Sequence, residues 1–143
     1  MKTIVVGVDG SEAAGVALEF AVEEAVVRGA TLRVISVWDV PASLYQGTVA
    51  ITPVLETFEE EAGAIVAEAV ERVKELAPDL PCEGVVLNGS PQIRLVEEAQ
   101  GALLVVVGRR GQGALASLLM GSVSRHVVDH APCPVIVVPP LVR

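Results

Sequence analysis

The chain alternates short apolar runs with longer segments of helical periodicity, and this alternation constrains its fold more than any other feature. Apolar runs predict strands at residues 3–8, 31–37, 82–87, 103–107 and 134–138. Helical patterns predict helices at residues 11–28, 54–77, 90–100 and 122–130, and a stretch without periodicity predicts a long loop at 38–52. Strands that are apolar on both sides belong to parallel sheets covered on both faces. The alternation therefore predicts a three-layer, doubly wound α/β domain, and it leaves the strand order open.

The first predicted helix has clear signals at both ends. Ser11 stands just before the helical pattern and is a good N-cap. Gly29 stands just after it, where helices often end on a residue with a left-handed backbone. Ala13, Val16 and Phe20 are expected to form the apolar side of this helix.

Charge and hydropathy exclude several classes of protein. The chain has 143 residues and a formal net charge of −8 with ten basic residues, which argues against a nucleic-acid-binding face. Its longest apolar stretch, residues 102–107, is far shorter than the ~20 residues of a membrane span. The first residues run straight into a strand pattern without a leader. We therefore expect a cytoplasmic protein with no nucleic-acid and no membrane partner.

Cysteine and histidine form no strong redox or metal motif. Cys82 and Cys133 lie far apart and each begins an apolar run, so both are expected as reduced, buried thiols, with a disulfide left open. His126 and His130 have the four-residue spacing of a zinc-binding pair on a helix, but no third ligand is evident. A metal site therefore stays unknown.

Two loops that follow predicted strands carry the residues with the most chemical potential. Asp9 and Gly10 follow the first strand, and a glycine-rich segment at residues 108–121 follows the fourth. In a doubly wound sheet, ligands bind at the carboxyl ends of the strands where the strand order reverses. If the first and fourth strands are neighbours there, both loops meet. Asp9 could then accept a hydrogen bond from a ribose hydroxyl or help to hold a divalent cation.

The glycine-rich segment leads into a predicted helix, whose N-terminal amides and dipole favour phosphate. Gly108, Gly111 and Gly121 would let the backbone approach an anion, and Ser122 and Ser124 could add hydroxyl donors. Arg109 and Arg110 form a positive spot, and we expect at least one of them to meet phosphate. In the simpler alternative, the glycines only form turns, while Asp9 and Ser11 only cap the first helix.

The sequence resembles the universal stress protein (UspA-like) family from end to end. The opening IVVGVDGS at residues 4–11 looks like the family's first strand and turn, and residues 121–138 look like its ending. Between them Gly108, Gly111, Gly121 and Ser122 match the pattern G-x2-G-x9-G-[ST], which marks the ATP-binding branch of the family. The resemblance implies a single universal stress protein domain over residues 1–143. It also implies a Rossmann-like five-stranded sheet with the order 3-2-1-4-5.

Carried over residue by residue, the resemblance implies an adenine nucleotide site. It puts Asp9 near the ribose and phosphates and the backbone of Val37 against adenine. Two departures, Ser36 and Leu103, lie outside the phosphate loop. The implied nucleotide-binding residues are Val8, Asp9, Gly10, Val37, Val107, Gly108, Arg110, Gly111, Gly121, Ser122, Val123 and Ser124.

The expected function is that of a nucleotide-responsive regulatory module in the stress response, with ATP as ligand together with Mg²⁺ or Mn²⁺. The chain has no GxxxxGK[ST] and no GxGxxG after its first strand, and no convincing general base stands beside the glycines. Hydrolysis is therefore expected to be slow or absent, with no catalytic residue assigned.

The last apolar run begins at Pro134 and ends at Val138, and in the family this strand forms a homodimer. The alternatives are a nucleotide-independent dimeric interaction protein and a metal-assisted ATP phosphohydrolase.

Overall fold

The strands form one parallel sheet with the order β3-β2-β1-β4-β5, in a computed structural model that describes residues 2–40, 52–109 and 120–140. The strands are β1 (Thr3–Gly7), β2 (Thr31–Trp38), β3 (Cys82–Asn88), β4 (Leu104–Gly108) and β5 (Val135–Val138). Both the parallel sheet and the order 3-2-1-4-5 are thereby confirmed. The central strand, β1, has β2 and β4 as its direct neighbours.

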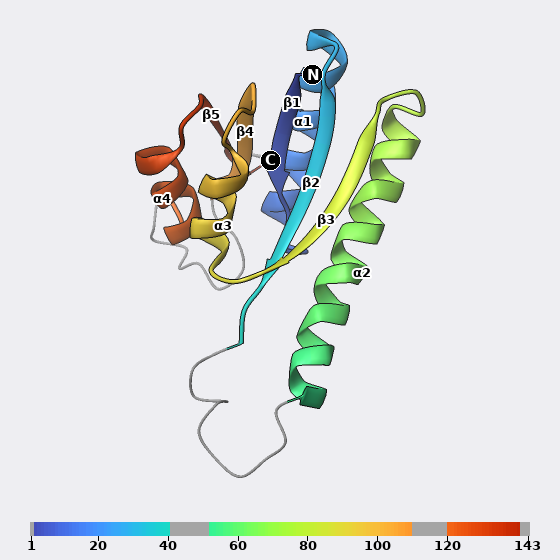
Figure 1. The fold of residues 1–143 in the computed structure, drawn as a ribbon. Coiled ribbons are helices and arrows are strands. Elements are labelled where there is room, and N and C mark those ends of the chain that lie inside the picture. Colours follow the sequence, from blue (N-terminus) through green and yellow to red (C-terminus); the bar gives the residue numbers. More distant parts are fainter. Residues whose placement is uncertain (1, 41–51, 110–119, 141–143) are drawn as a thin grey trace.

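Four helices in the described ranges cover the two faces of this sheet (Figure 1). They are α1 (Glu12–Arg28), α2 (Thr52–Leu76), α3 (Pro91–Glu98) and α4 (Ser122–His130). Buried residues of α1 and α2 belong to one core cluster, and those of α3 and α4 to another on the opposite face. The three-layer α/β architecture is therefore confirmed. None of the helices within the described ranges is both long and apolar enough to cross a membrane.

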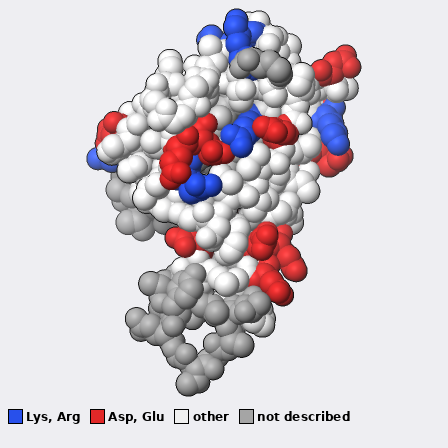
Figure 2. Space-filling view, in the orientation of Figure 1, with Lys and Arg blue, Asp and Glu red and all other residues white. Residues whose placement is uncertain are grey.

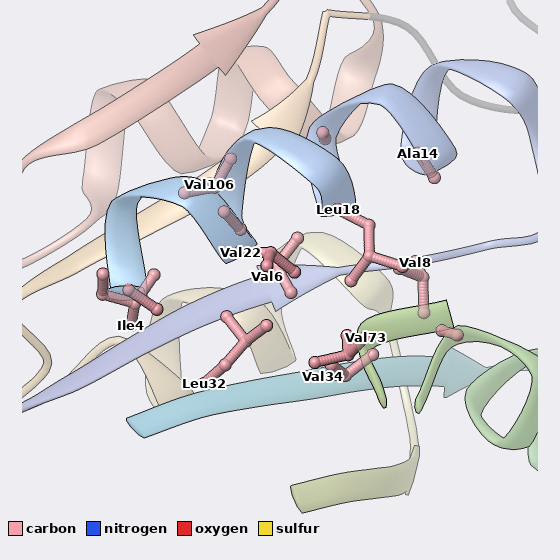
Figure 3. Packing of buried hydrophobic residues seen from close by; sticks show 14 of the residues in the cluster. Ile4, Val6, Val8, Ala14, Leu18, Val22, Leu32, Val34, Val73 and Val106 are labelled. Atoms are coloured by element: carbon pink, nitrogen blue, oxygen red, sulfur yellow. The ribbon is translucent and has the colours of Figure 1, made fainter. Parts of the chain in front are cut away.

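The core is divided by the sheet, because successive strand residues point to opposite faces. On the α1 and α2 side, Ile4, Val6, Leu32 and Val34 are each 0% exposed (Figure 3). On the α3 and α4 side, residues one position along the same strands, such as Val5 and Ile35, form the second cluster. This arrangement explains why the strand sequences are apolar without alternation.

The buried side of α1 differs from the side expected from the sequence. Ala13, Val16 and Phe20 are only partly buried. The fully buried positions are taken mostly by small residues: Ala14, Ala17, Leu18, Ala21, Val22 and Ala25. The helix packs against β1 and β4, and alanines let its backbone lie close to them. Val16 and Phe20 pack at the edge of the same core cluster, so the prediction was incomplete: it named the larger apolar side chains and missed the alanines at the centre of the contact.

The ends of the elements differ from their expected positions by a few residues at most. Strand β1 ends at Gly7, although the N–H of Val8 still donates to the carbonyl of Ile35 on β2, 2.8 Å away. Ser11 and Gly29 cap α1 as predicted, and Gly29 is left-handed with φ 63°. Residues 41–51 of the expected loop lie outside the described residues.

Both cysteines are free, as expected, but each is only partly buried. Burial is the main cause that raises the pKa of the Cys82 and Cys133 thiols above the ordinary value. Neither is therefore a reactive thiolate near neutral pH.

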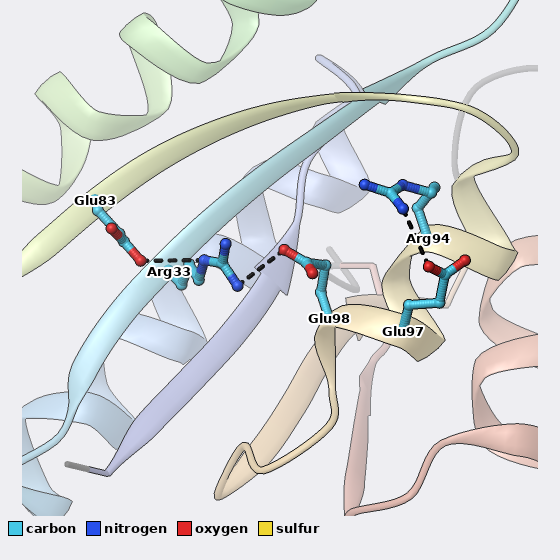
Figure 4. A network of polar contacts seen from close by, with 5 residues as sticks. All are labelled: Arg33, Glu83, Arg94, Glu97 and Glu98. Carbon is cyan, nitrogen blue, oxygen red and sulfur yellow. Dashed lines mark hydrogen bonds and ion pairs between the residues drawn. The ribbon is translucent and has the colours of Figure 1, made fainter.

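A chain of ion pairs joins β2 to its neighbours on the α3 side of the sheet (Figure 4). Arg33 Nε lies 3.1 Å from Glu83 Oε1 on β3, and its Nη1 lies 2.8 Å from Glu98 Oε1 on α3. Arg94 and Glu97 form a second pair within α3, at 3.0 Å. These side chains are partly exposed, so the pairs add little stability.

Candidate functional site

The turn after β1 and the first residues of the glycine-rich segment, Gly108 and Arg109, follow neighbouring strands. Val6 on β1 pairs with Val106 on β4, so both strands end at the same edge of the sheet. From β1 the chain crosses to β2, whereas from β4 it crosses to β5 on the other side. This reversal is the place where doubly wound sheets bind ligands.

The β4 end and the start of α1 are in close backbone contact. A side-chain Cβ at Gly108 would lie only 2.9 Å from the carbonyl oxygen of Ala13. Position 108 requires glycine because Ala13 lies so close, and not because of the backbone conformation of Gly108. Gly108 thus allows the first turn of α1 to lie directly against the end of β4.

The turn from β1 into α1 is hydrogen-bonded within itself. Gly10 has φ 82°, a left-handed conformation that favours glycine. The N–H of Ser11 donates to Asp9 Oδ1 at 2.9 Å, and the N–H of Ala14 donates to Ser11 Oγ at 3.1 Å. The carboxylate of Asp9 is therefore oriented by the turn that it belongs to.

The two described ends of the glycine-rich segment are joined through the backbone of Arg109. Its carbonyl accepts from the N–H of Gly121 and from the hydroxyl of Ser124, both at 2.7 Å. Its N–H donates to the carbonyl of Val138 on β5, 2.9 Å away. Residues 109 and 121 are consequently in direct contact, and α4 begins at the end of β4.

Helix α4 begins without a side-chain cap. Its N-cap is Gly121, and the first bond of the helix runs from the N–H of Arg125 to the carbonyl of Gly121. The amides of residues 122–124 therefore have no partner within the helix. Together with the helix dipole, they form an electropositive end that suits an anion.

The two serines of α4 differ in their surroundings. Ser122 is exposed, whereas Ser124 is only 2% exposed. The sequence predicted hydroxyl donors from both, but only the hydroxyl of Ser122 is open to solvent. Nothing in the local sequence separates the two, because the difference depends on the contact between residues 109 and 121.

Arg109 carries a buried polar atom that lacks a partner. Its Nε has no hydrogen-bond acceptor among the described residues. The Nε atoms of Arg33 and Arg94 are likewise buried without a hydrogen-bond partner, but both of these side chains form ion pairs with carboxylates. Arg28, Arg72 and Lys74 also pair with carboxylates. Figure 2 shows this for one face, where most basic side chains lie against acidic ones. The sequence predicted that Arg109 or Arg110 meets phosphate, and no ion pair among the described residues involves Arg109. Arg110 and Gly111 lie outside the described residues.

Four valines predicted near the nucleotide lie around this edge of the sheet. The side chains of Val8 and Val107 are buried in the core, so only their backbones are available to a ligand. Val37 and Val123 are partly buried and pack against the cluster on the α3 and α4 face.

The histidine pair on α4 gains no third ligand. Among the described residues, no group of three histidine, cysteine, aspartate or glutamate side chains could hold a metal ion. The rings of His126 and His130 stack with centroids 4.2 Å apart, and His130 Nδ1 lies 3.0 Å from the carbonyl of His126.

The fold defines a doubly wound α/β protein, and comparisons with known proteins give the family. The sequence model of the universal stress protein family matches residues 1–139, so the chain belongs to that family. A universal stress protein of Mycolicibacterium smegmatis is 38% identical over 141 residues, which cover 96% of this chain and 45% of that protein. The chain thus spans about half the length of the curated relatives it matches.

Solved structures of similar proteins share the whole fold. The universal stress protein UspA from Lactobacillus plantarum has a TM-score of 0.82 and 29% identity, covering 96% of this chain and 97% of that one. A universal stress protein in complex with cAMP has a TM-score of 0.75 and 27% identity, covering 98% of each chain. A universal stress protein from Archaeoglobus fulgidus in complex with dAMP has a TM-score of 0.68 and 28% identity, covering 96% and 97%.

Proposed function

We propose that this chain binds an adenine nucleotide, and that the preferred nucleotide is ATP with Mg²⁺ or Mn²⁺. The proposed site lies at the start of α4, beside the turn from β1 into α1. The chain acts as a cytoplasmic, nucleotide-responsive regulatory module of the stress response, with slow or no ATP hydrolysis.

The observation that carries this proposal is the uncapped N-terminus of α4, which lies against the backbone of Arg109, a residue whose Nε is buried without an acceptor among the described residues. Both lie where the strand order reverses, and both are donors without an acceptor of their own among the described residues. An anion supplies what they lack. The cAMP and dAMP bound in similar proteins support an adenine nucleotide as that anion.

Each part of the nucleotide has a proposed partner in the two turns. The amides of Ser122, Val123 and Ser124 hold phosphate oxygens, and Asp9 accepts from the ribose or helps to hold the metal ion. The backbone of Val37 contacts adenine. The nucleotide meets no side chain at Gly10, Gly108 and Gly121. The proposal also includes Gly111 and Arg110, which lie outside the described residues. The remaining proposed contacts come from the backbones of Val8 and Val107.

A divalent ion fits this site because it would offset the repulsion between Asp9 and the phosphates. Neither turn contains a histidine or lysine that could move a proton or neutralise a γ-phosphate. Since phosphoryl transfer depends on such positioned charges, we propose little or no turnover.

The test is to measure ATP binding by calorimetry for the wild type, Gly121→Val and Gly111→Val. We expect both variants to lose binding while circular dichroism shows an intact fold. Gly15→Ala is the matched control, because a Cβ at Gly15 meets no atom within 4 Å. Unchanged ATP affinity in both valine variants would refute the assigned loop. Mass spectrometry of the denatured protein identifies any nucleotide that co-purifies.

A nucleotide-independent interaction protein is the second candidate, and strand β5 favours it. This strand lies at the edge of the sheet, and its apolar residues Val135, Ile136 and Val137 are only partly buried. An exposed apolar edge invites pairing, and we propose a homodimer through β5. Native mass spectrometry with and without ATP tests it: a dimer that never binds nucleotide favours this candidate. Turnover with Mg²⁺ or Mn²⁺ that is lost in Asp9→Ala would instead favour a phosphohydrolase.

A further inference from the structure

The hydroxyl of Ser124 is committed to the protein itself. Its Oγ lies 2.7 Å from the carbonyl oxygen of Arg109 and 3.1 Å from that of Gly121. A hydroxyl has a single proton, and the shorter contact takes it. With Ser124 only 2% exposed, a phosphate has no open path to this oxygen.

The backbone of Arg109, whose carbonyl accepts from Ser124, joins three elements. The carbonyl of Arg109 receives two donors from the start of α4, the hydroxyl of Ser124 and the N–H of Gly121. Both lone pairs of that oxygen are therefore used. The adjacent N–H of Arg109 donates to Val138 at the end of β5. A change at Ser124 thus acts directly on the junction of β4, β5 and α4.

We propose that the Ser124 hydroxyl is a positioning group, which holds the first turn of α4 against the end of β4 and does not contact the ligand. The uncapped amides of residues 122–124 are fixed in place by this bond before any ligand arrives. Preorganised donors bind more tightly than donors that must be ordered on binding. The effect on nucleotide affinity rests on the proposed function, but the positioning itself belongs to the nucleotide-free protein.

The first measurement is amide hydrogen exchange by NMR on the full chain without nucleotide. Ser124→Ala is expected to speed exchange at the amides of Gly121 and Arg109, while the core amides of Val5 and Val105 keep their wild-type rates. Ser124→Thr keeps the hydroxyl and should restore slow exchange. Ser122→Ala should leave the exchange of Gly121 unchanged, because Ser122 is exposed.

The second measurement is ATP affinity by calorimetry. Ser124→Ala is expected to weaken binding roughly three- to tenfold, since one buried hydrogen bond contributes about that much. Ser124→Thr should recover most of the loss. Ser90→Ala is the matched serine control: Ser90 is the N-cap of α3 and its side chain makes no cap bond, so affinity and exchange should both stay unchanged.

Three results would overturn the proposal. Slow exchange at Gly121 together with weaker binding in Ser124→Ala would mean that Ser124 contacts the ligand directly. Faster exchange at every core amide would mean that the hydroxyl only adds global stability. No change in either measurement would mean that it has no role. If the wild type binds no adenine nucleotide, the proposed function fails, and the exchange rates at Gly121 and Arg109 still decide the positioning role by themselves.

Discussion

The turn from β1 into α1 and the connection from β4 into α4 lie at the same edge of the sheet, yet they satisfy their polar groups in opposite ways. In the first, Ser11 caps the amide of Ala14 and Asp9 receives the N–H of Ser11. In the second, Gly121 offers no side chain, and the buried hydroxyl of Ser124 bonds back to Arg109. The first turn bonds within itself, whereas the amides at the start of α4 have no acceptor among the described residues. Changes in the first should therefore alter stability, and changes in the second should alter binding.

The glycines of the two turns also have different tasks. Gly10 is needed for its left-handed backbone, at φ 82°. Gly108 is needed for space, because Ala13 lies against it. Glycine is thus needed for backbone conformation at residue 10 and for lack of a side chain at residue 108. Substitutions at the two positions can distinguish these two requirements.

The largest loss of stability is expected from Gly108→Ala. The new Cβ would meet the carbonyl oxygen of Ala13 at 2.9 Å, which belongs to the backbone and cannot swing aside. Either α1 or the end of β4 must shift, as in an overpacked core, at a cost of about 2 kcal/mol in the free energy of unfolding. Urea denaturation followed by circular dichroism measures this cost.

The matched control for that substitution is Gly15→Ala, within α1, where an added Cβ meets nothing within 4 Å. Alanine is a better helix former than glycine, so this variant should gain about 0.5–1 kcal/mol. If Gly108→Ala unfolds at the same urea concentration as Gly15→Ala, the close contact between β4 and α1 does not exist in solution.

A somewhat smaller loss is expected from Gly10→Ala. A left-handed backbone costs a residue with a Cβ roughly 1–2 kcal/mol, and that is the expected fall in unfolding free energy. Asparagine tolerates this conformation better, so Gly10→Asn should lose clearly less. Thermal and urea unfolding of the two variants give the comparison, and equal losses would show that backbone conformation is not what selects glycine here.

Much of this fold could be predicted from local sequence, because strand runs and helix caps are local signals. Ser11, Gly29 and the sequence of elements were all predicted correctly. The strand order was not available from the alternation of elements, since it depends on which strands pair, and it came from the family resemblance. The buried side of α1 was predicted incompletely, because small alanines form its centre while Phe20 packs at its edge.

Only part of the candidate site could be predicted from the sequence. The glycine spacing and Asp9 could be read directly, but the opposite surroundings of Ser122 and Ser124 could not. These depend on the contact between Arg109 and Gly121, which are twelve positions apart in the chain. Only the folded backbone shows that one serine hydroxyl closes this junction while the other is open to solvent.

A loss of about 1 kcal/mol is expected from Ser11→Ala. The substitution removes the oxygen that accepts from the N–H of Ala14 and leaves that amide without its cap. Ser90→Ala, at the N-cap of α3, should stay within about 0.5 kcal/mol of the wild type, because the Ser90 side chain makes no cap bond. Chemical denaturation of both variants checks the difference. Similar losses at the two serines would mean that the observed cap of α1 does not contribute in solution.

The smallest change in stability is expected from Arg109→Gln, at the start of the connection from β4 into α4. The Nε of Arg109 has no acceptor among the described residues, and no ion pair among them involves its guanidinium, so the substitution should shift the unfolding free energy by less than about 0.5 kcal/mol. If the guanidinium meets phosphate, however, nucleotide binding should weaken, and more for ATP than for AMP because ATP carries more charge. Calorimetry with both nucleotides at low and high salt separates these effects. A variant that loses stability and keeps the wild-type ratio of ATP to AMP affinity would contradict this prediction. Arg109 would then be a structural residue, and the amides at the start of α4 would form the anion site alone.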